Sequence, residues 1–544
     1  MLIFQHLKLS KCIKLTTDKI SGLQICQNPE IQEEKMTDLS GLIHTTCEKF
    51  AKRNAFMLKE NKKIFTVTFE DFEKRIIRTA TGLKKRGITD CNVIISGKNS
   101  YEWVVSFLSA IYAGCVVVPL DASLPAEEYS RIVKRSDAKA ILFSPDIEEK
   151  CLCQETEIKI PFTEIESLEE EGNFELPKKM SDDLAIILFT SGTTANSKAV
   201  MLSHKNFVSN VESLSKWEDF RAEDRYLALL PFFHAFGITG FLVYFYHGAC
   251  TAFCEGLRIK KAFTDYTITA FVAVPLILDK MKANILSHIE KTGRGKKFNF
   301  ARKLSGFLRK FGIDIRRKLF GEIHKQLGGG IRLIITGAAA ISKETADFYN
   351  DIGMTLIQGY GLSETAPVLS AENPENMRAG SVGKALPGVE VKIFEPDDEG
   401  IGEIIAKGPN IMLGYKDEPS PIYDGYFHTG DIGRIDSDGY IFICGRKKNV
   451  IVLPNGENVF PEEIESKINE IEGVLESVVY MTGEKAVIGA KVVYDEELTN
   501  TEKIGVEIEE INKTLAEFKK IRKIEYTVEE FVKTSTGKIK RNLI

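Results

Sequence analysis

Short apolar runs alternate with amphipathic segments through residues 36–320 of the chain. Strands are predicted at residues 92–96, 115–120 and 140–143, with a helix at residues 101–113. Uninterrupted apolar runs are typical of strands that are buried on both faces. Their alternation with helices indicates parallel sheets covered by helices, which is an α/β fold.

A second strand–helix–strand unit is predicted further along. An apolar run at residues 331–337 is followed by a helix that Ser342 begins and by a strand at residues 354–358. Ligands of such folds bind beyond the carboxyl ends of parallel strands. The predicted site therefore includes the small residues that follow the two strands, which are Gly337, Ala338, Ala339, Gly359 and Gly361.

After Gly380 the pattern changes to short strands separated by Gly and Asp turns, at residues 390–394, 402–407 and 440–444. This pattern favours a small antiparallel sheet or a β-barrel-like subdomain. From Lys448 onward, helices are predicted at residues 461–471 and 501–521 among four strands, which indicates a small α+β domain. The expected organisation is a tail or upstream extension at 1–35, a large domain at 36–447 and a C-terminal domain at 448–544.

Composition narrows the class of protein. A chain of 544 residues with 43% hydrophobic and 27% charged residues is expected to be globular with several domains. The net charge of −5 argues against a nucleic-acid partner. The ten cysteines are scattered without metal-ligand spacing, which favours reduced thiols and a cytoplasmic protein. The sequence shows neither a signal peptide nor an apolar run long enough to span a membrane.

A hydroxyl-rich turn follows the apolar strand predicted at residues 185–189. Backbone N–H groups, side-chain hydroxyls and one ammonium group suit a polyphosphate. The alternative is an ordinary Ser/Thr-rich surface loop. The sequence is not a Walker P-loop, because Lys198 lies between Ser197 and Ala199. The candidate residues are Thr190, Ser191, Gly192, Thr193, Thr194 and Lys198.

Four further motifs follow this turn in order, at residues 359–365, 429–431, 445–448 and 534–538. The ordered set resembles the adenylate-forming superfamily, which includes acyl-CoA synthetases, luciferases and the adenylation domains of peptide synthetases. The resemblance extends over about residues 36–544, and it is greatest to the long-chain fatty acyl-CoA synthetases. It implies that the enzyme uses ATP, Mg²⁺ and CoA.

The resemblance implies roles for individual residues. Thr190 and Glu364 would hold a magnesium ion that bridges phosphate oxygens. Tyr360 would lie against the adenine ring, and Asp431 would accept hydrogen bonds from the ribose, which Arg446 would also approach. The resemblance makes Lys538 the catalytic lysine, which stabilises charge on the reacting phosphate. The alternative for Lys538 is a solvated basic terminus, because other lysines surround it.

The thiol step follows only from the resemblance. The small domain would be mobile and would turn about Lys448 after adenylation, so that it guides the pantetheine of CoA inward. Gly456 would allow the backbone to pass close to that pantetheine.

The acyl substrate is expected near residues 231–237, where His234 would lie beside the carboxylate. The alternative is a core histidine in a tight turn. Gly337, Ala338, Ala339 and Gly359 leave room for an alkyl chain. No acidic residue is predicted to be buried where it could pair with an α-ammonium group.

Residues 291–325 carry twelve Lys and Arg side chains against two acidic residues, Asp314 and Glu322. Five apolar residues recur through this segment at helical spacing, which predicts a basic amphipathic helix. Such a helix suits the surface of an anionic membrane at the inner face. The alternative is a solvated helix whose apolar stripe packs on the protein. The five apolar residues are Leu304, Phe307, Leu308, Phe311 and Ile315.

Two departures from the family pattern concern the phosphate turn and the terminal motif. Ala195, Ser197 and Ala199 replace two glycines and a proline of the turn, and Val532 stands where a proline is frequent. The hydroxyls and Lys198 are retained, so we still expect catalysis.

Three functions are compatible with these motifs. The first is a ligase that joins a long-chain fatty acid to CoA through an acyl-adenylate. The second transfers the acyl group to a separate acyl carrier protein. The third is a non-catalytic paralogue that senses nucleotide or acyl chains, which the joint presence of Thr190, Glu364, Asp431, Arg446 and Lys538 argues against.

Overall fold

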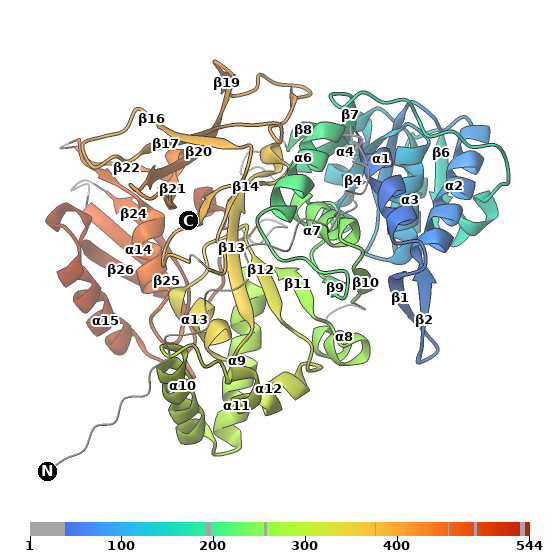
Figure 1. The fold of residues 1–544 in the computed structure, drawn as a ribbon. Helices are drawn as coiled ribbons and strands as arrows, with labels where there is room; N and C mark the ends of the chain where they lie inside the picture. The colour runs from blue at the N-terminus through green and yellow to red at the C-terminus, as the bar shows by residue number, and fades with distance from the viewer. Residues whose placement is uncertain are drawn as a thin grey trace, which may run out of the picture. The chain divides into compact units, whose positions relative to one another are not determined.

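The computed structural model describes residues 38–190, 197–254, 258–375, 377–454, 456–483, 487–533 and 539–544. Residues 37–544 form one compact unit. The predicted tail at 1–35 and the motif residues Ser191, Gly192, Thr193, Thr194 and Lys538 lie outside the described residues. The mixed α/β fold confirms the predicted fold class (Figure 1).

The first large sheet has seven strands in the order β18-β8-β7-β4-β3-β5-β6, and the five strands from β7 to β6 run parallel. Strand β8 is antiparallel to both β7 and β18. The strands are β3 (Asn92–Ser96), β4 (Val116–Leu120), β5 (Ala138–Phe143), β6 (Ile158–Pro161), β7 (Leu184–Thr190), β8 (Lys198–Ser203) and β18 (Gly414–Tyr415). The helices that occur between or beside these strands in the chain are α1 (Leu39–Lys49), α2 (Phe69–Lys85), α3 (Tyr101–Tyr112), α4 (Ala126–Ser136), α5 (Glu148–Leu152) and α6 (His204–Ser215).

The second large sheet has nine strands in the order β15-β14-β13-β12-β11-β9-β10-β1-β2, of which the six from β13 to β1 are parallel. Its strands are β1 (Asn54–Glu60), β2 (Lys63–Thr68), β9 (Arg225–Ala228), β10 (Cys250–Phe253), β11 (Ala270–Ala273), β12 (Leu333–Thr336), β13 (Thr355–Gly361), β14 (Val368–Ala371) and β15 (Lys384–Ala385). The helices of this region are α7 (Ala235–Tyr246), α8 (Ile259–Tyr266), α9 (Pro275–Lys291), α10 (Gly295–Arg309), α11 (Arg316–Leu319), α12 (Gly321–Gln326) and α13 (Lys343–Asp351).

Local sequence explains where two of the helices begin. Ser203 and Asn206 form a capping box at the start of α6, in which each side chain bonds the other residue's backbone N–H. Ser342 caps α13 by accepting a hydrogen bond from the backbone N–H of Thr345, as the sequence predicts.

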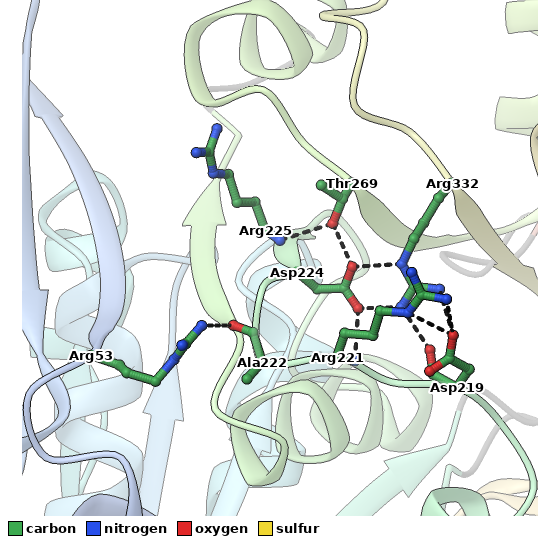
Figure 2. Close-up of polar contacts among 8 residues, drawn as sticks. All are labelled: Arg53, Asp219, Arg221, Ala222, Asp224, Arg225, Thr269 and Arg332. Atoms are coloured by element: carbon green, nitrogen blue, oxygen red, sulfur yellow. Dashed lines mark hydrogen bonds and ion pairs between the residues drawn. The ribbon is translucent and has the colours of Figure 1, made fainter. Parts of the chain in front are cut away.

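A buried ion pair joins the amino ends of three strands of the nine-stranded sheet. Arg332, just before β12, donates from Nε to Oδ1 of the buried Asp224 at 2.8 Å, and Thr269 before β11 donates to the same oxygen at 2.7 Å. Arg332 also donates to the backbone oxygen of Asp219 at 2.6 Å. Figure 2 shows these contacts, which fix the segment between α6 and β9 to that edge of the sheet.

The remaining strands form smaller sheets. An antiparallel sheet comprises β16 (Glu390–Phe394), β17 (Gly402–Lys407), β19 (Ile422–Tyr423), β20 (Tyr426–Ile435) and β21 (Ile441–Arg446). After it come the pair β22 (Ile451–Val452) and β23 (Asn458–Val459), and a sheet of β24 (Val474–Thr482), β25 (Val487–Tyr494) and β26 (Ile521–Thr527) with helices α14 (Pro461–Ile468) and α15 (Thr501–Thr514). This last region has its own hydrophobic cluster, which supports a domain boundary near Lys448, although the boundary stays a prediction.

Three predicted helices are too long. The helix at 461–471 ends at Ile468, and the helix at 501–521 ends at Thr514. Asn512 exchanges two side-chain hydrogen bonds with the backbone of Ile521, which begins β26 and cannot continue the helix. The basic segment is also not one helix, because α10 ends at Arg309 and Gly312 takes a φ of 75°.

Candidate active site

A single cavity of ≈ 3200 Å³ brings the predicted site residues together. Of those that the structure describes, all but Gly456 line it. Gly456 has a φ of 87°, which a glycine favours, and no described atom lies within 4 Å of the place of a Cβ there, so its role beside pantetheine stays a prediction. The predicted residues on the cavity wall are Thr190, Lys198, His234, Gly337, Ala338, Ala339, Gly359, Tyr360, Gly361, Glu364, Asp431, Arg446 and Lys448.

The carboxyl ends of β12 and β13 form one wall of this cavity. A Cβ on Gly337 would lie 3.0 Å from the backbone oxygen of Gly359 and 3.3 Å from the ring of Phe236. A Cβ on Gly361 would overlap the backbone oxygen of Pro367 at 1.8 Å. Position 361 therefore admits only glycine without a backbone shift, and position 337 leaves little room for a side chain.

Asp431 is the centre of a three-residue polar cluster. Its Oδ2 accepts a hydrogen bond from the Tyr360 hydroxyl at 2.7 Å, and its Oδ1 pairs with Nε of Arg446 at 2.8 Å. Burial, followed by the charge of Asp431 and this hydrogen bond, raises the pKa of Tyr360 well above its usual value. The cluster places an aromatic ring, a carboxylate and a guanidinium on one side of the cavity.

A second cluster surrounds Glu364. Its Oε1 accepts a hydrogen bond from the Tyr415 hydroxyl at 2.8 Å, and the Lys198 ammonium lies 4.3 Å from the centre of the Tyr415 ring. Thr190 and Lys198 are directly opposite each other in the β7–β8 pair. Lys198 also forms an ion pair with Glu418 at 3.3 Å. The structure therefore brings Thr190, Lys198 and Glu364 to the same end of the cavity.

Tyr415 is a site residue that the sequence analysis missed. It lies in a two-residue strand that pairs with β8, and burial together with Glu364 raises its pKa. A strand of two residues has no periodic pattern, so the Gly-Tyr pair was the sole sequence signal that could have pointed to Tyr415.

Metal binding at Glu364 would depend on bound phosphate. Across the described ranges, no group of three or more His, Cys, Asp and Glu side chains could hold a metal ion by itself. One carboxylate and one hydroxyl fit Mg²⁺, which commonly takes few protein ligands beside substrate phosphates and water.

His234 lies on the cavity wall at the start of α7, half-buried, with its ring centre 4.4 Å from that of Phe233. This position differs from that of a fully buried core histidine.

Near the other end of the chain, Ile539 and Arg541 line the cavity, and they follow Lys538 closely in the sequence. Burial and the charges of Arg446 and Arg541 lower the pKa of Lys448.

Two buried acidic residues on the cavity wall were not singled out from the sequence. Glu218 and Glu372 are 9% and 7% exposed, and both line the cavity. Each lies in an irregular segment next to an element, where no periodic pattern predicts burial.

Comparison with known proteins identifies the family. The model of the AMP-binding enzyme family matches residues 43–416, so the chain belongs to that family and to the adenylate-forming superfamily. This confirms the resemblance that the motifs suggest.

Several curated relatives and solved structures are similar to the chain. A mouse long-chain-fatty-acid–CoA ligase is 27% identical over 85% of this chain and 78% of its own length. Human long-chain-fatty-acid–CoA ligase 1 is 29% identical over 74% of this chain, and the match spans 65% of the human protein. The solved structure of an anthranilate CoA ligase in complex with anthranoyl-AMP has a TM-score of 0.77 at 20% identity, covering 93% of this chain and 96% of that one, which shows the shared fold.

We predict that Tyr415→Phe weakens the affinity for Mg²⁺ in nucleotide binding about 10–100-fold, because the Tyr415 hydroxyl orients the Glu364 carboxylate. The remaining ring still contacts Lys198. The measurement is a titration of ATP binding with Mg²⁺, and Tyr423→Phe, at a tyrosine that is 62% exposed, is the matched control. Equal magnesium dependence in the wild type and in Tyr415→Phe would show that this hydrogen bond has no such role.

Proposed function

We propose that the protein activates a long-chain fatty acid with ATP, releases pyrophosphate to give an acyl-adenylate, and transfers the acyl group to the thiol of CoA. One observation carries the proposal: a single cavity joins the Glu364 and Asp431 clusters to an extended apolar wall. The names of the mouse and human relatives support the substrate class.

The polar end of the cavity suits the adenylation step. A carboxylate must attack the α-phosphate of ATP, so two anions have to be held together in line. Lys198 and the hydroxyl of Thr190 would bind phosphate oxygens, while Thr190 and Glu364 would hold the magnesium ion that neutralises their charge. Tyr360 would pack on the adenine ring, and Asp431 with Arg446 would bind the ribose.

The apolar wall suits an alkyl chain. It extends away from His234 and the Gly337 turn, along α7, β11 and α9. The same cavity is lined further out by Arg309 and Arg316 of the basic segment. Its apolar lining includes Phe233, Phe236, Val243, Val272, Ile277 and Met281.

An acyl carrier protein is the alternative acceptor. A chloroplast protein of Arabidopsis thaliana named long-chain-fatty-acid–[acyl-carrier-protein] ligase is 26% identical over 83% of this chain. In either case, residues 448–544 would turn about Lys448 between the two steps. The test measures pyrophosphate release across acids of increasing length, and then thioester formation after addition of CoA or of acyl carrier protein.

Each outcome of that test separates the candidates. Thioester formed with CoA supports the proposal, and thioester formed only with the carrier supports the alternative. Absence of pyrophosphate with every acid would leave the non-catalytic paralogue as the better account.

We predict that Lys538→Ala slows adenylation by roughly 10²-fold or more, because it removes a positive charge that stabilises the reacting phosphate. Thioester formation from supplied acyl-adenylate should be retained. Single-turnover rates of the two steps are the measurement, with Lys540→Ala as the control. Equal loss of both steps in Lys538→Ala would contradict this role.

We also propose that the basic segment 291–325 contacts an anionic membrane. Three of the five predicted stripe residues, Leu304, Leu308 and Ile315, are half-buried, whereas the other two, Phe307 and Phe311, are 57% and 66% exposed. The exposed aromatic side chains lie among lysines and arginines, which suits a surface of acidic headgroups. Among the described residues, no helix is both long and apolar enough to cross a membrane.

Replacing both Lys303 and Lys310 with Gln should weaken binding to anionic vesicles by about 2 kcal/mol, at about 1 kcal/mol for each basic side chain near the surface. Vesicle co-sedimentation with phosphatidylglycerol and with phosphatidylcholine is the measurement. The control replaces the exposed Lys62 and Lys63 with Gln on the β1–β2 hairpin. Equal binding to the two lipids would contradict a role for these charges.

A further inference from the structure

Glu218 is a buried carboxyl group on the cavity wall that has no partner among the residues that the structure describes. Its side chain receives no hydrogen bond and forms no ion pair with any residue in the described ranges, and its Oε1 is fully enclosed. The reaction proposed above gives this carboxyl no role. An ionisable group that is buried and unpaired is costly to keep, so its presence calls for a ligand.

Glu372 is the second buried carboxyl of this region. The indole N–H of Trp217 donates to the backbone oxygens of Ala371 and Glu372 at 3.1 and 3.2 Å, so the segment that carries Glu218 is bound to the segment that carries Glu372. One oxygen of Glu372 accepts the backbone N–H of Gln358 at 2.9 Å. Both residues line the same cavity.

Glu218 lies between two residues that are held at opposite ends of the β12–β13 pair. Trp217, the preceding residue, bonds to the backbone oxygen of Ala371, which pairs with Gly359 near the carboxyl end of β13. Asp219, the next residue, is held by Arg332 at the amino end of β12 (Figure 2). Gly337 follows the carboxyl end of the same strand, five residues further on, which corresponds to about 17 Å of extended chain. Glu218 is therefore positioned between the level of Arg332 and the level of the Gly337 turn.

Two buried tyrosine hydroxyls lie near this part of the cavity. Tyr226 and Tyr244 are fully buried with ring centres 4.5 Å apart, and neither hydroxyl has a partner among the described residues. A Cβ on Gly240, which lines the cavity, would lie 2.9 Å from the Tyr226 hydroxyl. Because Gly240 has no side chain, little separates the cavity from the Tyr226 hydroxyl, the second polar group without a partner among the described residues.

Burial raises the pKa of Glu218 to about 8, with the charges of Asp219 and Glu372 adding to the shift, and burial raises the pKa of Glu372 to about 7. The two groups thus titrate near neutral pH. A hydroxyl can bond to either protonation state, whereas an ammonium group favours the ionised carboxylates.

We propose that this part of the cavity, lined by Glu218 and Glu372, binds a hydrogen-bond donor, a hydroxyl or an ammonium group, which the acyl chain carries. An unsubstituted alkyl chain would leave Glu218 without a partner. The inference rests on the proposed function, because it takes the substrate to be an acid that enters this cavity.

The test compares kcat/KM for pyrophosphate release among three kinds of acid. These are stearate, stearates with one hydroxyl group at different positions along the chain, and stearates with one amino group at the same positions. For at least one position we expect the substituted acid to exceed stearate. Glu218→Leu should lower the ratio of substituted to unsubstituted acid by roughly tenfold or more, because a site built to bond a polar group discriminates strongly. Stearate itself should react at least as well in Glu218→Leu as in the wild type.

Glu218→Gln is a second variant of nearly the same shape. It should retain recognition of the hydroxylated acid and lose any preference for the ammonium group, which distinguishes the two donors. Glu223→Gln, at a neighbouring side chain that is 77% exposed, is the control. Stearate preferred over every substituted acid, together with an unchanged ratio in Glu218→Leu, would overturn the inference.

Failure of the proposed function would give a different result. If no acid yields pyrophosphate, binding of the same acids is measured by calorimetry instead. Tighter binding of a substituted acid that depends on Glu218 would support the inference, and equal affinities for all the acids would refute it.

Discussion

The buried carboxylate of Asp431 joins two sheets that the chain builds separately. Asp431 lies on β20 of the antiparallel sheet, bonds to Tyr360 on β13 of the nine-stranded sheet, and pairs with Arg446 on the neighbouring β21. A buried carboxylate is tolerated only when it is paired and hydrogen-bonded, so these contacts fix how the two sheets meet. The end of the cavity that is proposed to bind the nucleotide lies at that junction.

The same principle applies at the phosphate end. Glu364 is held by Tyr415, whose strand β18 is attached to β8, and Lys198 begins β8. The group predicted to hold magnesium and the cation predicted to bind phosphate are thus positioned through one tyrosine. The basic segment, the apolar wall and the two buried carboxyls all adjoin this one cavity, so the proposed adenylation site and the proposed site for the acyl chain would share a single space.

Much of this architecture could be predicted from sequence. The apolar run at residues 93–95 predicts a buried parallel strand because burial on both faces leaves no polar position there, and the ordered motifs predicted the family. Tyr415 was missed because its strand has only two residues. Glu218 was missed because it lies in an irregular segment, which has no hydrophobic periodicity from which burial could be predicted. The helix predicted at 501–521 was too long because the side chain of Asn512 binds the start of the next strand, a contact that no local pattern encodes. The roles of Lys538 and of the phosphate turn stay predictions.

Acid-dependent exchange of labelled pyrophosphate into ATP, in the absence of any acceptor, is the most direct test of the central claim that this cavity forms an acyl-adenylate. The account predicts exchange that requires both a long-chain acid and Mg²⁺, and that Asp431→Ala abolishes while the protein stays folded. Binding of ATP without exchange for any acid would contradict it.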